Sequence, residues 1–93
     1  MKEYVIQMPG AYGDWCYIIG PTGERSTYEA RVFSSVAEAE EYKDKVLMTV
    51  RFRPPEYYGA HPYGVTVKER FERMAVIPVE NVIGFSGKLR LIR

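Results

Sequence analysis

Residues 35–47, SVAEAEEYKDKVL, carry the clearest secondary-structure signal in the sequence. Ser35 and Glu38 match a capping box, in which the serine oxygen accepts a free backbone N–H and the glutamate reaches back to the cap. Acidic residues come early and lysines late, as the helix dipole prefers, and Glu41 and Lys45 are spaced for an ion pair. We therefore expect a helix over 36–47, whose inward face carries Val36, Ala39, Tyr42, Lys43, Val46 and Leu47.

The rest of the chain consists mainly of short β-type runs separated by glycine and proline. Residues 3–8 and 15–19 predict an antiparallel hairpin, because a glycine-containing turn joins them. Further runs that fit strands are 27–33, 47–52, 75–77, 82–85 and 88–93. Residues 66–74 fit either a helix or a strand, since they repeat the capping-box pattern yet follow directly on a β-type valine.

One helix among several strands predicts an α+β domain: an antiparallel sheet of about four to six strands, with the helix packed on one face. A length of 93 residues indicates a single compact domain spanning 1–93. The expected core comprises Tyr4, Ile6, Trp15, Tyr17, Ile19, Val32, Val36, Ala39, Val46, Val50, Ile77, Val82 and Phe85.

Composition restricts the setting of the chain. A hydrophobic fraction of 46% and a charged fraction of 27% are typical of a globular protein. The single cysteine, Cys16, excludes an intrachain disulfide, and small secreted domains usually need one. No apolar run is long enough to span a membrane, and the first residues lack a signal-peptide core. We expect a cytoplasmic location, in the cell of origin or in a host.

The most unusual segment is the loop 51–64, which carries three of the eight tyrosines, the single histidine and two arginines. Long irregular loops in compact domains are often functional, and tyrosine and arginine are common interface anchors. The loop equally suits a packing role over one end of the sheet. Within it, Pro54-Pro55-Glu56-Tyr57 matches the pattern that WW domains bind. Our leading hypothesis is a non-enzymatic module that contacts a protein partner through Arg51, Arg53, Tyr57, Tyr58, His61 and Tyr63, with self-association through the same loop as a separate option.

The two halves of the chain differ in charge. Residues 1–48 carry five basic and eight acidic side chains, a net charge of −3, whereas residues 49–93 carry eight basic and four acidic ones, a net charge of +4. The alternative hypothesis is therefore a nucleic-acid-binding accessory protein, although three glutamates interrupt the basic series. Its expected contact residues are Lys68, Arg70, Arg73, Lys88, Arg90 and Arg93.

Catalysis is the remote alternative. His61 has alanine and proline as neighbours and lacks a nearby nucleophile, and one histidine falls short of a zinc ligand set. Cys16 lies among large apolar residues and is expected in the core. The glycines match no phosphate-binding template. We expect no catalytic residue, no metal and no cofactor.

Residues 30–42, ARVFSSVAEAEEY, lead from a strand through two serines into the acidic helix. This cassette resembles small orphan α+β proteins of phages and mobile elements, a group that includes anti-CRISPR inhibitors. The resemblance implies a regulator that acts by contact, and it transfers no site residue to this chain.

Overall fold

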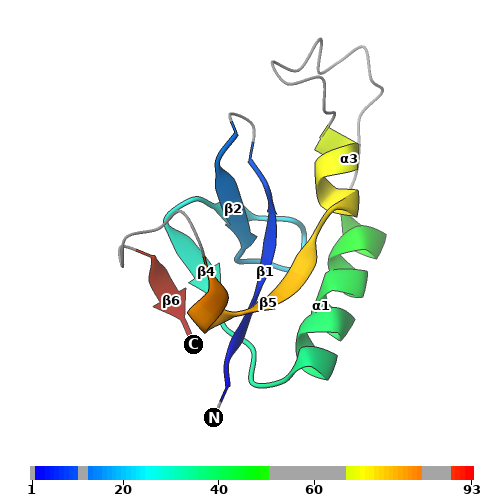
Figure 1. Cartoon of the computed structure of the whole chain (residues 1–93). Helices are drawn as coiled ribbons and strands as arrows, with labels where there is room; N and C mark the ends of the chain where they lie inside the picture. Colours follow the sequence, from blue (N-terminus) through cyan, green and yellow to red (C-terminus); the bar gives the residue numbers. More distant parts are fainter. Residues whose placement is uncertain (1, 11–12, 51–66, 83–88) are drawn as a thin grey trace.

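Strand β1 (Tyr4–Pro9) is the centre of the fold in the computed structural model, which describes residues 2–10, 13–50, 67–82 and 89–93. It pairs on one side with β2 (Trp15–Ile18) and on the other with β5 (Ala75–Pro78). Strand β3 (Arg25–Ser26) extends the sheet beyond β2. The result is an antiparallel sheet with the order β3-β2-β1-β5 (Figure 1).

The hairpin between β1 and β2 confirms the prediction for residues 3–8 and 15–19. Its register places Gln7 opposite Tyr17 and Met8 opposite Cys16. The turn begins where the Gly10 amide donates to the Asp14 carbonyl at 2.8 Å. Two β-forming runs with a glycine-containing turn are thus sufficient to specify this part of the sheet.

Helix α1 (Val36–Thr49) confirms the predicted helix and runs two residues further. The Ser35 side chain accepts from the Glu38 amide at 3.1 Å, as a cap should. The other half of the expected capping box is different, because the Glu38 carboxylate accepts from the Ser34 hydroxyl at 2.7 Å. The expected Glu41–Lys45 ion pair is present at 3.7 Å.

The strand considered for residues 47–52 is wrong over 47–49, which belong to α1; residues 51–52 lie outside the described part. The Thr49 hydroxyl donates to the Pro21 carbonyl at 2.7 Å and lies 2.8 Å from the Lys45 carbonyl. Val50 leaves the helix with an extended backbone, and its amide still donates to the Val46 carbonyl. Hydrogen bonds at the last turn therefore outweigh the β propensity of this run.

The ambiguous segment 66–74 contains a helix, α3 (Val67–Glu72), which leads into β5. After Pro78 the chain forms a short 3-10 turn, η1 (Val79–Asn81), closed by the Val82 amide donating to the Val79 carbonyl. The predicted strand over 82–85 is therefore wrong at Val82, and residues 83–85 lie outside the described part. Proline supplies no amide for the next ladder bond, which favours ending the strand there.

The predicted strand over 27–33 is divided. Strand β4 (Glu29–Arg31) pairs in parallel with β6 (Arg90–Ile92), so the expected terminal strand is confirmed within 88–93. Phe33 instead joins β1, exchanging two backbone hydrogen bonds of 2.8 Å with Tyr4. The main sheet is antiparallel as predicted, and this small parallel pair is an addition.

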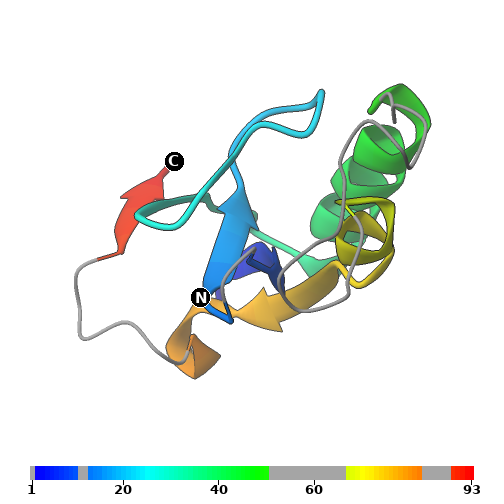
Figure 2. The ribbon, with the colours of Figure 1, turned by 90° about the horizontal axis from the view of Figure 1, so that it is seen from above.

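The elements form layers around the main sheet. Helices α1 and α3 lie on one side and β6 on the other in the view from above (Figure 2). The larger core cluster lies on the helical side and includes Ile6, Met8, Ile18, Phe33, Ala39, Val46, Phe71 and Met74. The smaller one comprises Val5, Tyr17 and Ala30, with half-buried side chains from β5, η1 and β6 against it. The sheet is thus covered on both faces.

Most of the expected core is confirmed: Ile6, Tyr17, Ala39 and Val46 are fully buried, and Tyr4, Trp15, Ile19, Val32, Val50, Ile77 and Val82 are half-buried. The assignment of Val36 to the core is wrong, since 47% of its surface is exposed. Leu47 on the same predicted face is 38% exposed. Phe85 lies outside the described residues. Neither described helix has the length and apolarity needed to cross a bilayer.

We predict that Gly23→Ala destabilises the fold by roughly 1–3 kcal/mol. Gly23 has φ of +95°, and an added Cβ would lie 3.1 Å from Phe71 Cζ and from Val50 Cγ2. Thermal and denaturant unfolding measure the effect. Gly23→Asn separates the causes, because asparagine tolerates positive φ but still carries the Cβ. A Gly23→Ala midpoint equal to that of the unsubstituted chain would contradict the prediction.

Candidate functional site

The residues expected to contact a protein partner all fall in the part of the chain that the structure does not describe. They are Arg51, Arg53, Tyr57, Tyr58, His61 and Tyr63. The two described elements that flank them are α1, which ends at Thr49, and α3, which begins at Val67. The loop hypothesis therefore stays a prediction, with a known starting point at the last turn of α1.

Five of the six residues proposed to contact nucleic acid are described, and Lys88 is not. Three of them face a carboxylate. Lys68 Nζ lies 3.9 Å from Glu72, Arg90 lies 3.9 Å from Glu29, and Arg93 lies 2.8 Å from Glu3. Because each cation is matched by an anion of the same chain, these residues add little net positive field for a phosphate backbone.

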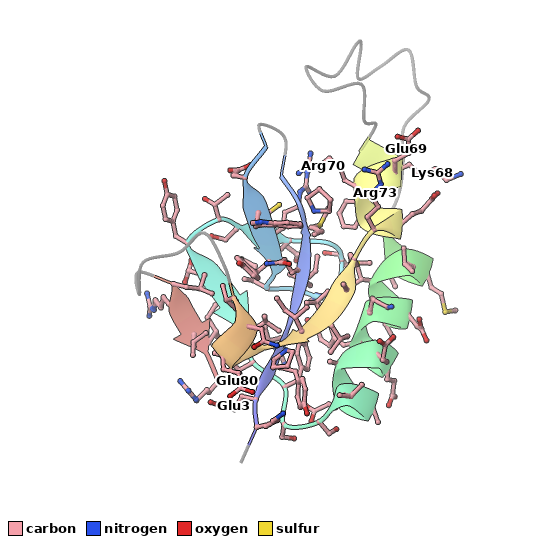
Figure 3. All side chains as sticks on the ribbon, in the orientation of Figure 1. Glu3, Lys68, Glu69, Arg70, Arg73 and Glu80 are labelled. Carbon is pink, nitrogen blue, oxygen red and sulfur yellow. The ribbon has the colours of Figure 1, made fainter. Side chains whose placement is uncertain are left out.

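Arg70 does not belong to an exposed basic face. Its side chain is 6% exposed and lies between α3 and the β1–β2 hairpin (Figure 3). Nε donates to the Pro9 carbonyl at 2.9 Å, and a terminal nitrogen lies 3.6 Å from Cys16 Sγ. The sequence-based assignment of Arg70 to a phosphate contact is corrected accordingly, because its donors serve a structural contact.

Arg73 differs from these four. It is exposed at the end of α3, near Lys68 and Glu69 in the side-chain view (Figure 3). Among the candidate cations in the described part of the chain, Arg73 alone has neither burial nor a carboxylate within ion-pair distance. One such arginine does not make a phosphate-binding surface, since specific complexes usually use many phosphate contacts.

Glu3 and Arg93 form the closest ion pair that links β1 to the end of β6. Arg93 Nε lies 3.0 Å from Glu3 Oε2, and the second donor lies 2.8 Å from Oε1, a two-point contact. The hydrogen bond from Arg93 lowers the pKa of the Glu3 carboxyl below its ordinary value. The same bond raises the pKa of Arg93. Arg93 is thus committed to holding the last strand.

Cys16 is confirmed as a core residue, 4% exposed. Burial raises the pKa of its thiol, and the nearby Arg70 guanidinium opposes that shift without reversing it. A thiol that is buried and protonated at neutral pH is a poor nucleophile. The Cys16–Arg70 contact therefore joins the hairpin to α3 and offers no reactive centre.

Arg31 and Tyr42 connect β4 to α1 on the helical side. The guanidinium carbon of Arg31 lies 5.0 Å from the centre of the Tyr42 ring and 5.9 Å from that of Phe33. The Tyr42 hydroxyl is buried and has no hydrogen-bond partner among the described residues. Burial raises the pKa of Tyr42. These cation–π contacts hold β4 and α1 together, so the cluster has a structural role.

The described residues contain no group of three metal-ligating side chains close enough to hold an ion. A shallow depression is lined by Lys2, Glu3, Val79 and Glu80; Glu3 and Glu80 are labelled in Figure 3. Its charged groups already pair, Lys2 with Glu80 and Glu3 with Arg93. The described surface thus shows no assembled acid–base or metal site for which a substrate can be named.

Sequence reasoning missed the exposed apolar side chains of the structure. Met48, in the last turn of α1, is 84% exposed, and Tyr28, between β3 and β4, is 70% exposed. Val36, which was assigned to the core, and Leu47, which was placed on the same helical face, are also partly exposed to water. On α1 only Ala39 and Val46 are fully buried. Their seven-residue spacing does not distinguish them in the sequence from Val36 and Lys43, so the sequence carries no signal for the helix orientation.

Comparison with protein-family models, curated proteins and solved structures found no match for this chain. The orphan character suggested by residues 30–42 agrees with that result. The function must therefore be argued from the chain's own residues.

We predict that Glu3→Gln lowers the thermal midpoint at neutral pH and reduces its fall on acidification. A carboxyl whose folded-state pKa is lowered stabilises the fold above its ordinary pKa, and that contribution is lost as the pH falls through the lowered value. Thermal midpoints at neutral and acidic pH measure this. Glu41→Gln, whose exposed pair with Lys45 spans 3.7 Å, is the control and should keep the original acid sensitivity. Identical pH profiles for Glu3→Gln and the unsubstituted chain would refute the argument.

We also predict that Cys16 resists alkylation in the folded protein and reacts once the protein is unfolded. Arg70→Ala leaves the Pro9 carbonyl without its charged donor, so it should cost roughly 1–3 kcal/mol and speed alkylation. Mass spectrometry of iodoacetamide-treated protein follows the reaction. Arg73→Ala, an exposed neighbour, is the matched control. Rapid labelling of the folded, unsubstituted chain would show that the thiol is accessible after all.

Proposed function

We propose that this chain is a small non-enzymatic binding module that acts by contacting a protein partner. The observation that carries the proposal is the character of the described surface. Its candidate cations are largely matched by carboxylates, while a large apolar side chain, Met48, stands 84% exposed. Exposed apolar and aromatic side chains are what a protein interface needs, whereas a phosphate backbone needs unmatched cations.

The position of Met48 supports a role for the loop 51–64. Met48 belongs to the last turn of α1, three residues before the loop begins. Methionine adapts its shape to a partner surface, and tyrosine and arginine anchor one. We propose that the partner contacts Met48 together with loop residues, foremost Arg53, Tyr57, Tyr58, His61 and Tyr63, with Arg51 at the entry.

The finer identity is part of the same proposal. The resemblance of residues 30–42 to phage and mobile-element proteins suggests a regulator or inhibitor of a host enzyme, acting in the cytoplasm. That cassette is the support for this finer proposal. In the structure it forms the junction between β4 and α1, where a capped helix start is also structurally useful. Nucleic acid remains an outcome of the test below, because Arg73 and the residues outside the described part can still contribute cations.

Capture from a lysate of the organism that encodes the chain, followed by mass spectrometry, identifies the partner. The combined variant Arg53→Glu and Tyr58→Ala should weaken its binding roughly tenfold or more, about 1.4 kcal/mol, with a nearly unchanged thermal midpoint. Met48→Glu should weaken it as well, because a charge would replace an apolar contact.

The matched control is Lys68→Ala combined with Arg90→Ala, which removes two cations already matched by glutamates. It should leave partner binding intact. If binding survives the loop variant, the loop is the wrong surface. If capture is abolished by nuclease, and if affinity for DNA or RNA probes falls steeply with added salt, the partner is nucleic acid and the protein-contact proposal fails.

A further inference from the structure

Four side chains of α1 form a line that the core does not use. Val36, Glu40, Lys43 and Leu47 follow one another at spacings of four, three and four residues, which places them along one side of a helix. The fully buried residues Ala39 and Val46 lie on a neighbouring line. The packing of α1 on the sheet therefore explains the second line and leaves the first on the flank.

The ends of this flank are apolar and exposed to water. Val36 is 47% exposed and Leu47 is 38% exposed. Between them, Lys43 Nζ lies 2.9 Å from Glu40 Oε2, and the Lys43 side chain is only 21% exposed. Paired helices likewise combine apolar residues at their contact with charged residues beside it that pair between the two helices.

The order of residues on the flank is self-complementary. Read from one end it is apolar, acidic, basic, apolar, and an antiparallel copy presents the reverse order. A two-fold axis between Glu40 and Lys43 sets Val36 against Leu47 of a second copy, and Glu40 against Lys43 of that copy. Interfaces between identical chains related by a two-fold axis require this kind of reciprocity.

We propose that two copies of this chain associate through antiparallel packing of their α1 helices along Val36, Glu40, Lys43 and Leu47. The helix is placed for it, because α1 forms the outer margin of the molecule and runs beside β5, the edge strand of the main sheet (Figures 1 and 2). Each Val36 loses water contact against a leucine, and each glutamate gains a lysine of the other chain in addition to its own.

The charge order selects a second copy over another protein as occupant. An unrelated helix would need the matching pattern by coincidence, whereas a copy of this chain has it by symmetry. The outer edge of β5, which pairs with no other strand in the described part, is a weaker candidate for self-association. Pro78 has no amide to donate, so a second sheet edge would find few hydrogen bonds there.

The pairing does not depend on the proposed partner contact. Met48 lies one residue beyond Leu47, about 100° around the helix, so it points away from the flank. In an antiparallel pair the two C-terminal ends of α1 lie at opposite ends of the helix pair, which separates the two partner-binding regions. A dimer would then be able to engage two partner molecules at once.

The test uses the full chain and two single charge reversals. Sedimentation equilibrium over a concentration series up to roughly 1 mM should show a monomer–dimer equilibrium for the unsubstituted protein. Glu40→Lys sets two lysines of one chain against two of the other, and Lys43→Glu does the same with glutamates. Each variant alone should begin to form dimers only at a concentration at least tenfold higher than the unsubstituted chain.

Mixing the two variants is the decisive measurement. In the mixture every lysine meets a glutamate of the other chain, although the 2.9 Å pair within each chain stays broken. Dimers should therefore reappear as a heterodimer of Glu40→Lys with Lys43→Glu. A merely structural role for the pair would give no such rescue, because mixing cannot repair a contact inside one chain.

Controls keep the result interpretable. Glu41→Lys breaks the comparable Glu41–Lys45 pair on another side of α1 and should leave the dimer unchanged. Thermal midpoints verify that each variant is folded. An unsubstituted chain that stays monomeric throughout the series overturns the proposal, and so does a mixture that associates no better than either variant alone.

Discussion

The structure depends on β1 being buried on both faces and paired along both edges. Val5 and Ile6 are neighbours in sequence, so they point to opposite faces of the sheet, and both are fully buried. That is possible only because α1 and α3 cover one face while β6 and its neighbours cover the other. The carbonyl of Glu3, just before β1, accepts a hydrogen bond from the Val79 amide, and Tyr4 in β1 exchanges two backbone hydrogen bonds with Phe33. Strands β2 and β5, β4 and both helices therefore contact this one six-residue strand, while β3 and β6 are attached to it through β2 and β4.

This central strand also shows what sequence reasoning can and cannot predict. The hairpin, α1 and the terminal strand were predictable, because turns, caps and periodicity act between near neighbours. The two-sided burial of β1 was not, since alternation gives no reason to expect apolar residues on both faces of a strand in an α+β sheet. The parallel pairing of Glu29 with Arg90 joins residues 61 positions apart, and no local sequence pattern predicts it. Val36 was misplaced for a related reason: six residues at helical spacing cover a wider arc of α1 than the sheet can bury.

The candidate site was predicted less well than the fold, and the cause is again distance in sequence. The Lys68–Glu72 pair lies within one helix and could be foreseen from its spacing. The carboxylates facing Arg90 and Arg93, those of Glu29 and Glu3, come from the first half of the chain, so the +4 charge of the second half, taken by itself, overstated the positive surface. Arg70 became a buried residue because α3 presents that side to the hairpin. The loop 51–64 was singled out by composition and lies outside the described residues.

The proposed contact function agrees with how the described residues use their surface. Both faces of the sheet are used to make the fold, so little interior remains for an enclosed catalytic site in a chain of 93 residues. The described cations are mostly matched within the chain, which lowers the nonspecific attraction that phosphates would feel. Apart from Tyr28, the large apolar side chains that are exposed in the described part of the chain lie on α1, divided between two sides of the helix. Leu47 and Val36 lie on the flank beside the sheet, and Met48 lies on the outer side near the loop. One helix can therefore present one surface to a copy of itself and another to a different protein, because 3.6 residues per turn separate adjacent positions widely enough for both.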